Sequence, residues 1–176
     1  TALLFGQMNE NAAVRFRVAF AATTLAQHFR DVEKQDVLFF VDNVFRFIQA
    51  GSELSSLLQS IPSEMGYQAT LETEVANFEN MLVSTKEASI TSIQTIYVPS
   101  DELSDPSVTA IMAHVDSVLI LSRGIAARNL YPPIDPLRST SSARRKEIVG
   151  EKHYELITKV LQMLSSYDRL SRIVAI

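Results

Sequence analysis

The chain contains no cysteine among its 176 residues. This absence excludes disulfide bonds, thiolate metal sites and a cysteine nucleophile. No apolar run is long enough to span a bilayer, and no signal peptide is visible. The formal net charge is only −4, so bulk electrostatics give no reason to expect binding to nucleic acid.

Glycine is scarce, and its placement excludes one phosphate-binding motif. None of the five glycines is followed by Lys-Ser or Lys-Thr, so the G-x-x-x-x-G-K-[ST] loop is absent. This chain by itself therefore lacks the backbone amides and the lysine of that phosphate cradle. The G-x-S-x-G turn of serine hydrolases is absent too. The three histidines lie far apart without metal-ligand spacing, which favours packing or surface roles for them.

The composition and the hydrophobic patterning indicate a globular α/β protein. Hydrophobic residues make up 47% and charged residues 20% of the chain, which is typical of a globular domain. Apolar or β-branched runs predict strands at residues 1–6, 36–41, 90–98 and 117–122. Helical spacing predicts helices within residues 9–33, 44–60, 70–83, 107–115 and 150–170. The alternation predicts a parallel sheet with helices on both faces and no internal domain boundary.

Spacing also predicts which side chains these elements bury. The run at 36–41 is continuously apolar, which is typical of a strand covered on both faces. Gly51 is expected to weaken the middle of its helix. Residues 129–145, with three prolines and many small polar residues, predict a long irregular segment. The predicted apolar face of the first helix comprises Val14, Val18, Ala21, Ala22, Leu25 and Phe29. That of the last helix comprises Tyr154, Ile157, Val160, Leu161 and Leu164.

Asp42 directly follows the apolar run at 36–41, and it has two interpretations. Ligands of parallel α/β sheets bind beyond the carboxyl ends of strands. An aspartate there can hold magnesium beside nucleotide phosphates, usually through a water. The alternative is a helix N-cap, because Asp42 also precedes a predicted helix. Arg46 lies one helical turn further on, where it can face a phosphate or pair with Asp42.

Two further segments also carry alternatives. Tyr131 is an aromatic residue flanked by prolines, which can stack on a base or pack the segment against the protein. Asp101, Glu102 and Asp105 share the loop after the predicted strand at 90–98. This loop is either a solvated acidic turn or a contact for a basic partner. Asp105 followed by proline also predicts an N-cap with proline at the first helical position.

The motifs together resemble one family over essentially the whole chain. The segments run in the order and near-spacing of the beta subunit of F-type ATP synthases. They are "FGQMNE", "RDVEKQDVLFFVDNVFRFIQAGSE", "GYQATLETE", "STKEASITSIQTIYVPSDELSDP", "AHVDSVLILSRGIAARNLYPPIDPLRSTSS" and "IVGEKHYE". The resemblance implies a RecA-like P-loop NTPase domain, three-layered with a mainly parallel sheet, whose P-loop lies outside this chain. Residues 1–176 correspond to the later part of that domain, running into the start of the C-terminal helical region.

The resemblance also implies roles for individual residues. Asp42 matches the Walker B aspartate that serves magnesium, and Asn43, Arg46 and Glu10 match residues of the catalytic phosphate site. Asn9 stands beside Glu10 at the polar end of a strand near that site. Tyr97 matches a tyrosine near the phosphates, and Tyr131 matches the aromatic residue that stacks on adenine. Asp101, Glu102 and Asp105 match the loop that contacts the rotating central stalk.

The activity implied by the resemblance is ATP synthesis or hydrolysis coupled to stalk rotation and proton transport. Magnesium is the implied cofactor and ATP or ADP the substrate. The implied partners are alpha-type subunits in a hexameric ring and a gamma-type central stalk, with no nucleic acid. Contact with the membrane is expected only through the rest of the complex, at an energy-coupling membrane of a bacterium, mitochondrion or chloroplast. Residues 1–176 alone are not expected to be active, since the P-loop and catalytic glutamate lie upstream in this family.

Several departures from the family pattern indicate a divergent member. The family's "NEPPGARARV" is here "NENAAVRFRV", which loses a proline pair and a glycine but keeps Arg15 and Arg17. Ala69 replaces a proline, Met81 replaces an arginine, and Arg138 stands where an acid is usual. Two alternatives to a catalytic synthase subunit follow: a noncatalytic ring member, and an ATPase motor that drives another machine.

Overall fold

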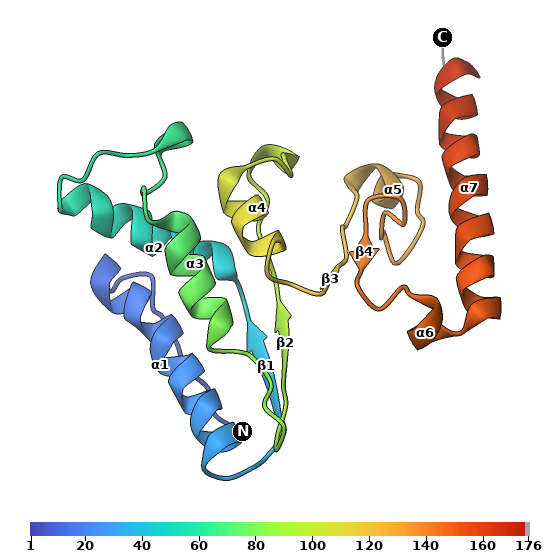
Figure 1. The fold of residues 1–176 in the computed structure, drawn as a ribbon. Helices are drawn as coiled ribbons and strands as arrows, with labels where there is room; N and C mark the ends of the chain where they lie inside the picture. The colour runs from blue at the N-terminus through green and yellow to red at the C-terminus, as the bar shows by residue number, and fades with distance from the viewer. Residues whose placement is uncertain (175–176) are drawn as a thin grey trace. The chain divides into compact units, whose positions relative to one another are not determined.

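The computed structural model describes residues 1–174. The chain divides into two compact units, Thr1–His114 and Val115–Ile176 (Figure 1). No proline- or glycine-rich stretch marks the junction of the two units at residues 114 and 115. This explains why the division was not predicted from the sequence. Within the described residues, no helix has both the length and the apolar character needed to cross a membrane.

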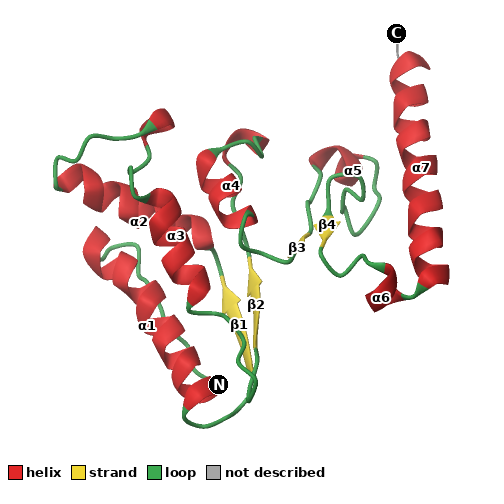
Figure 2. Ribbon diagram, viewed as in Figure 1, coloured by secondary structure: helices red, strands yellow, loops and turns green. Residues whose placement is uncertain are grey.

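Unit 1 alternates helices and strands, as its patterning predicts (Figure 2). The helices and strands after α1 lie within three residues of their predicted starts, and most end earlier than predicted. The elements are α1 (Ala12–Asp31), β1 (Val37–Val41), α2 (Val44–Leu57), η1 (Glu64–Gly66), α3 (Leu71–Asn80), β2 (Ile90–Gln94), η2 (Pro99–Asp101) and α4 (Pro106–Met112).

The sheet of unit 1 is a parallel pair, which confirms the predicted orientation. Strand β1 pairs with β2 in the register Val37↔Ile90 to Val41↔Gln94. One face of the pair packs on the helices, whereas Leu38 is 58% and Phe40 66% exposed on the other. The prediction that this strand is covered on both faces is therefore wrong for the described residues, because helices lie against only one face.

Residues 1–6 do not form the strand that their apolar run predicts. Leu3 and Phe5 are exposed, and the sheet of unit 1 contains only β1 and β2. A run with strand propensity needs a neighbouring strand that completes its hydrogen-bond ladder. Since no described strand pairs with residues 1–6, propensity alone does not fix them as a strand.

The buried face of α1 also differs from the predicted one. Val14 and Phe29 are exposed, and the buried positions are Ala12, Thr23, Ala26 and Arg30. The helix is rotated because Phe16 stacks on Phe47 of α2, with ring centroids 4.8 Å apart. The buried Arg30 is satisfied by the main-chain oxygens of Met81 and Val83 and by Asp31. Tertiary packing thus overrides the apolar spacing of the sequence.

Gly51 allows α2 to approach its neighbours closely. A Cβ added at this position would lie 2.6 Å from Gln68 Nε2, 2.7 Å from Glu74 Oε2 and 3.2 Å from a ring carbon of Phe16. Gln68 is buried and donates to Glu74 at 2.8 Å. The weakening of the helix that this glycine predicts is therefore offset by a contact that no other residue permits.

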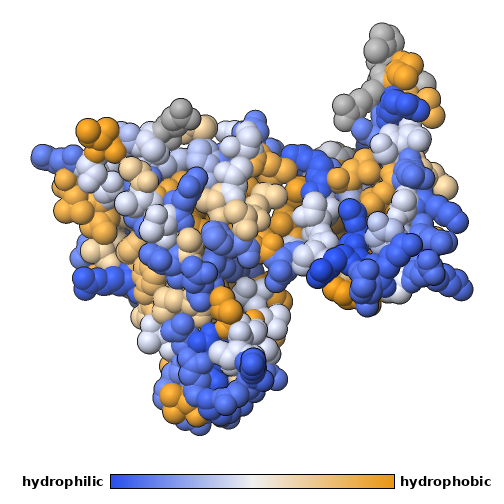
Figure 3. All heavy atoms as spheres, viewed as in Figure 1, coloured by the Kyte–Doolittle hydropathy of each residue, from blue (hydrophilic) through white to orange (hydrophobic). Residues whose placement is uncertain are grey.

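The α2–α3 connector, residues 58–70, is a largely exposed loop that contacts α2 again near its end. Ser52 on α2 donates its hydroxyl to Gly66 O at 3.4 Å. Four apolar side chains at the end of α2 and in the connector remain exposed: Leu57, Leu58, Ile61 and Met65. Figure 3 shows hydrophobic atoms gathered at this end of unit 1.

Unit 2 has little sheet and one long helix. Its elements are β3 (Ser117–Val118), α5 (Arg123–Ala127), β4 (Thr140–Ser141), α6 (Lys146–Val149) and α7 (Glu151–Val174). Strands β3 and β4 are antiparallel and two residues long, so the predicted strand at 117–122 is confirmed only at its start. Leu121 makes a single bridge to Ile134 instead of continuing the strand. The predicted irregular segment at 129–145 is confirmed except at β4.

The Gly51 contact gives a stability prediction. Gly51→Ala gains up to about 1 kcal/mol of helix propensity but overpacks a filled site, which typically costs about 1–3 kcal/mol. We expect the variant to unfold at lower denaturant concentration than the wild type, measured by circular dichroism. Gly124→Ala is the matched control, because its added Cβ would meet only Ser122 Oγ at 3.7 Å. Equal or higher stability of Gly51→Ala would contradict the close-approach interpretation.

Candidate functional site

The site that the sequence predicts lies where β1 and β2 end at the same edge of the sheet. The two ends are joined by main-chain bonds: Thr95 N donates to Val41 O at 2.9 Å, and Val44 N donates to Thr95 O at 3.1 Å. The hydroxyl of Thr95 donates to Asp42 Oδ1 at 2.9 Å. Thr95 was missed by sequence reasoning, although a residue that directly follows the adjacent parallel strand is placed beside Asp42 by the register alone.

Asp42 is not the N-cap of α2, so that interpretation is wrong. The cap is Asn43, whose side chain accepts from Arg46 N at 3.2 Å and whose backbone is extended. Asp42 stands one residue earlier, exposed and joined to Asn43 by a cis peptide bond. Its carboxylate is therefore available at the strand end rather than used in capping the helix.

Arg46 lies in the first turn of α2 with its side chain exposed. Its guanidinium donates to Gln49 Oε1 at 2.8 Å. Among the ion pairs of residues 1–174 there is none between Arg46 and Asp42, so the predicted pairing of these two residues is not formed. An exposed guanidinium beside a helix N-terminus is suited to an anion, because the helix dipole and the cation attract the same charge.

Tyr97 follows β2 and packs against Phe45 of α2. Its ring centroid is 5.5 Å from that of Phe45, which is buried. Tyr97 itself is 56% exposed. The contact with Phe45 fixes one side of the ring and leaves the other side accessible at the same end of the sheet.

Asn9 and Glu10 precede α1, whose N-cap is Asn11. Arg15 ties this segment to α2: its Nε donates to Glu10 O at 3.1 Å, and its guanidinium pairs with Glu53. The side chain of Arg15 is only 11% exposed. Arg15 is thus a positioning residue for the segment that carries Asn9 and Glu10, and it was noted in the sequence without a role.

Tyr131 belongs to unit 2, whereas the other predicted nucleotide-site residues belong to unit 1. Its side chain is 73% exposed. Within the described residues the ring does not pack its segment down, so the packing alternative is wrong, and a stacking role stays a prediction.

The acidic loop divides into an exposed part and a buried part. Asp101 and Glu102 are exposed, and Glu102 accepts from the Ser104 hydroxyl at 2.6 Å. Asp105 is only 5% exposed and caps α4, with Pro106 as its first residue, which confirms the predicted cap. The carboxylate of Asp105 accepts from Tyr67, Ser107 N and Ser107 Oγ. Asp105 is thus the one of the three predicted partner-contact residues whose carboxylate is buried and hydrogen-bonded within unit 1.

The donor set at the strand end fits magnesium but not a metal held by protein alone. In the described part of the chain, no three His, Cys, Asp or Glu residues gather to hold a metal ion. Magnesium usually takes one or two protein carboxylates together with substrate phosphates and waters. A single exposed carboxylate, Asp42, held by Thr95, suits that coordination.

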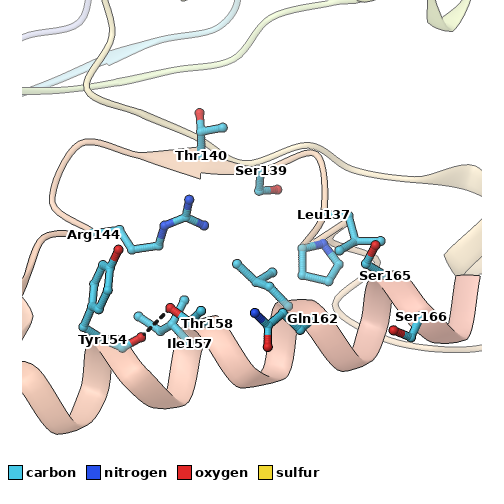
Figure 4. A pocket seen from close by; sticks show the side chains of 12 residues that line it. Leu137, Ser139, Thr140, Arg144, Tyr154, Ile157, Thr158, Gln162, Ser165 and Ser166 are labelled. Carbon is cyan, nitrogen blue, oxygen red and sulfur yellow. Dashed lines mark hydrogen bonds between the residues drawn. The ribbon is translucent and has the colours of Figure 1, made fainter.

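One pocket of unit 2 contains none of the predicted site residues. It measures about 810 Å³ and lies between residues 136–144 and one side of α7 (Figure 4). Arg144, Tyr154 and Gln162 are among its lining residues, and the hydroxyl of Thr158 turns back to Tyr154 O at 3.0 Å. The predicted apolar face of α7 lies partly here, through Tyr154, Ile157 and Leu161, whereas the predicted Val160 is exposed.

A half-buried acid lies behind the strand end. Glu79 of α3 accepts from Gln94 Nε2 at 3.0 Å, and Gln94 is the last residue of β2. Burial raises the pKa of the Glu79 carboxyl, while the hydrogen bond from Gln94 and the nearby His114 act in the opposite direction. Glu79 Oε1 and Gln94 Oε1 have no hydrogen-bond partner. Ionised Glu79 is therefore a destabilising feature of unit 1.

Parallel strands with helices between them, and an acid at their carboxyl edge, are typical of an α/β nucleotide-binding domain. Residues 1–141 match the family model described as ATP synthase alpha/beta family, nucleotide-binding domain. The chain therefore belongs to the ATP synthase alpha/beta family.

Solved structures similar to this chain come from two kinds of machine. The ATP synthase subunit NeqB from Nanoarcheaum equitans is 25% identical with a TM-score of 0.84, over 97% of this chain and 43% of that one. A prototypical ATPase of the type III secretion system of pathogenic bacteria is 25% identical with a TM-score of 0.79, over 89% and 45%. The assembled ATPase EscN from the type III secretion system of enteropathogenic E. coli shares the fold at 24% identity, TM-score 0.85, over 93% and 39%. The chain spans less than half the length of each.

The half-buried Glu79 gives a pH prediction. The folded pKa of Glu79 is raised above its unfolded value, so folding is penalised once the pH rises above the unfolded value. We expect Glu79→Gln to raise the melting temperature relative to the wild type by about 2 °C or more at pH 7. The difference should shrink towards pH 4, where the wild-type carboxyl is mostly protonated in both the folded and the unfolded protein. Glu72→Gln, an exposed position on the same helix, is the control. A difference that does not vary with pH would contradict the assignment.

Proposed function

We propose that residues 1–176 are the later part of the nucleotide-binding domain of a catalytic, beta-type subunit of a rotary ATP synthase or ATPase. The observation that carries this proposal is the strand-end arrangement. Asp42 is held by Thr95 at the carboxyl edge of two parallel strands, and Arg46 is exposed one turn further along α2. The P-loop that completes such a site is expected upstream in the full-length chain.

In this proposal the residues of unit 1 bind and orient the nucleotide phosphates. Asp42 serves magnesium through a bound water, and Arg46 with Asn43 balances phosphate charge at the start of α2. When bound, magnesium neutralises charge on the β- and γ-phosphates. Glu10 and Asn9 line the same site from the segment that Arg15 holds. Tyr97 approaches the phosphates, and Tyr131 stacks on the adenine base.

The assembly is also part of the proposal. Alpha-type subunits complete a hexameric ring, and a gamma-type central stalk contacts the loop that carries Asp101 and Glu102. Asp105 supports this loop from inside, because its carboxylate is buried. The complex lies at an energy-coupling membrane and couples phosphoryl transfer to rotation and proton transport. EscN, which has the same fold, is described as an assembled ATPase.

A second candidate is an ATPase motor that drives another machine. The type III secretion ATPase and the synthase subunit NeqB are equally identical to this chain, at 25%. The departures at Ala69 and Arg138 also indicate divergence from standard beta subunits. Identification of the proteins that copurify with the full-length subunit separates the two candidates. A noncatalytic ring member is the third candidate. A measurement of ATP turnover by the full-length subunit distinguishes it from the other two.

The test is Asp42→Asn in the full-length subunit within its ring. We expect kcat/KM for magnesium-dependent ATP hydrolysis to fall by about 10²-fold or more, as for loss of one electrostatic group in an active site. The magnesium concentration for half-maximal rate should rise as well. Asp116→Asn, an exposed carboxylate of unit 2, is the matched control. Normal turnover of Asp42→Asn would overturn the assignment, and no turnover of the wild type would favour the noncatalytic reading.

A further inference from the structure

A buried polar cluster joins two segments that are far apart in the sequence. The hydroxyl of Tyr67 lies 2.9 Å from Asp105 Oδ1 and 3.2 Å from Oδ2, and it lies 3.3 Å from Ser107 Oγ. Asp105 is 5% exposed and Ser107 is fully buried. Hydrogen bonds to an ionised acceptor in a water-poor setting are about twice as strong as neutral ones. This cluster is therefore a strong cross-link in unit 1.

On one side the cross-link holds the loop between β2 and α4. Asp105 ends this loop and caps α4 through Ser107 N at 2.9 Å. Residues 99–104 carry Asp101 and Glu102, and both Ser100 and Asp101 adopt positive φ values of 53° and 58°. Non-glycine residues rarely adopt this conformation. A loop with two such residues in succession keeps its shape only when its ends are fixed, and Asp105 fixes one of them.

On the other side the cross-link holds the α2–α3 connector and, through it, α2. Ser63 N donates to Tyr67 O at 2.7 Å, which closes the connector on itself. The next residue, Gln68, is buried against α2 at the point where only Gly51 leaves room. A continuous set of packed contacts therefore runs from the loop at 99–104 through Asp105, Tyr67 and Gln68 to the middle of α2.

The first turn of α2 belongs to the candidate site. Asn43 caps this helix, and Arg46 lies one turn inside it. Helices move as stiff bodies over such short lengths, so a displacement at Gly51 reaches the N-terminus of α2. Spatial continuity alone is not coupling, and only a changed equilibrium or rate at one end demonstrates it.

We propose that the Tyr67–Asp105 hydrogen bond is the positioning contact that links the loop at 99–104 to α2. This proposal rests on the proposed function, in which the loop contacts the central stalk. Tyr67 and Asp105 then act without touching nucleotide or stalk: Asp105 holds the loop in shape, and Tyr67 passes its displacement to the helix that carries Arg46. The alternative is a cross-link that serves stability alone.

The experiment uses Tyr67→Phe, which keeps the ring and removes only the hydroxyl. Turnover of the ring assembled from full-length subunits is measured with and without the stalk subunit. We expect turnover without the stalk to stay within about 2-fold of the wild type. The stimulation that the stalk produces should fall by about 5-fold or more, which is the scale of typical coupling between sites. Tyr167→Phe, an exposed tyrosine of α7, is the matched control.

A second variant separates coupling from stability. Asp105→Asn keeps a side-chain oxygen for capping α4 but removes the charge that Tyr67 contacts. We expect it to lower stalk stimulation as Tyr67→Phe does, and the double variant to be no worse than either single one. Additive losses, equal losses with and without the stalk, or unchanged stimulation would each overturn the proposal. A wild-type ring that the stalk does not stimulate would overturn the rotary function itself, and this proposal with it.

Discussion

The parallel pairing of β1 with β2 is the constraint on which the candidate site depends. The register Val41↔Gln94 places Asp42 and Thr95 side by side beyond the last paired residues. The Thr95 hydroxyl then fixes the Asp42 carboxylate at 2.9 Å, and Thr95 O receives the first amide of α2. A shift of one residue in this register would turn these side chains to the other face. The position of Arg46 follows from the same pairing, because Asn43, which directly follows Asp42, is the N-cap of α2.

Aromatic packing and one glycine determine how the helices support this edge. Phe16, Phe20 and Phe78 surround Phe47 of α2, with ring centroids 4.8 to 5.6 Å apart. Gly51 lets the same helix approach Gln68, so α2 packs against both the aromatic core and the α2–α3 connector. The helix that carries Asn43 and Arg46 at its start is thereby held by both the aromatic core and the connector. Asn43 and Arg46 at the start of α2 are therefore held in place by the packing of the helix, and they need no contacts of their own to the core.

The sequence predicts the local elements well and their surroundings less well. The strand before Asp42 and the cap at Asp105 follow from apolar runs and turn chemistry, which are local properties. The absent strand at 1–6, the rotated face of α1 and the one-sided sheet depend on neighbours that spacing cannot reveal. Asn43 rather than Asp42 caps α2 because the helix starts at Val44, and a sequence pattern does not fix a helix boundary to one residue. Thr95 and Tyr67 were missed because their roles arise only from contacts between distant segments.

The central claim is that Asp42 serves a magnesium ion beside a nucleotide. The most direct measurement is a structure of the full-length subunit in its ring with magnesium and a nucleotide bound, at a resolution that shows the ion and its waters. We expect the Asp42 carboxylate about 4 Å from the ion, with one coordinated water between them, and the Arg46 guanidinium beside a phosphate. An ion and phosphates at another edge of the sheet, remote from Asp42, would rule out this role for Asp42.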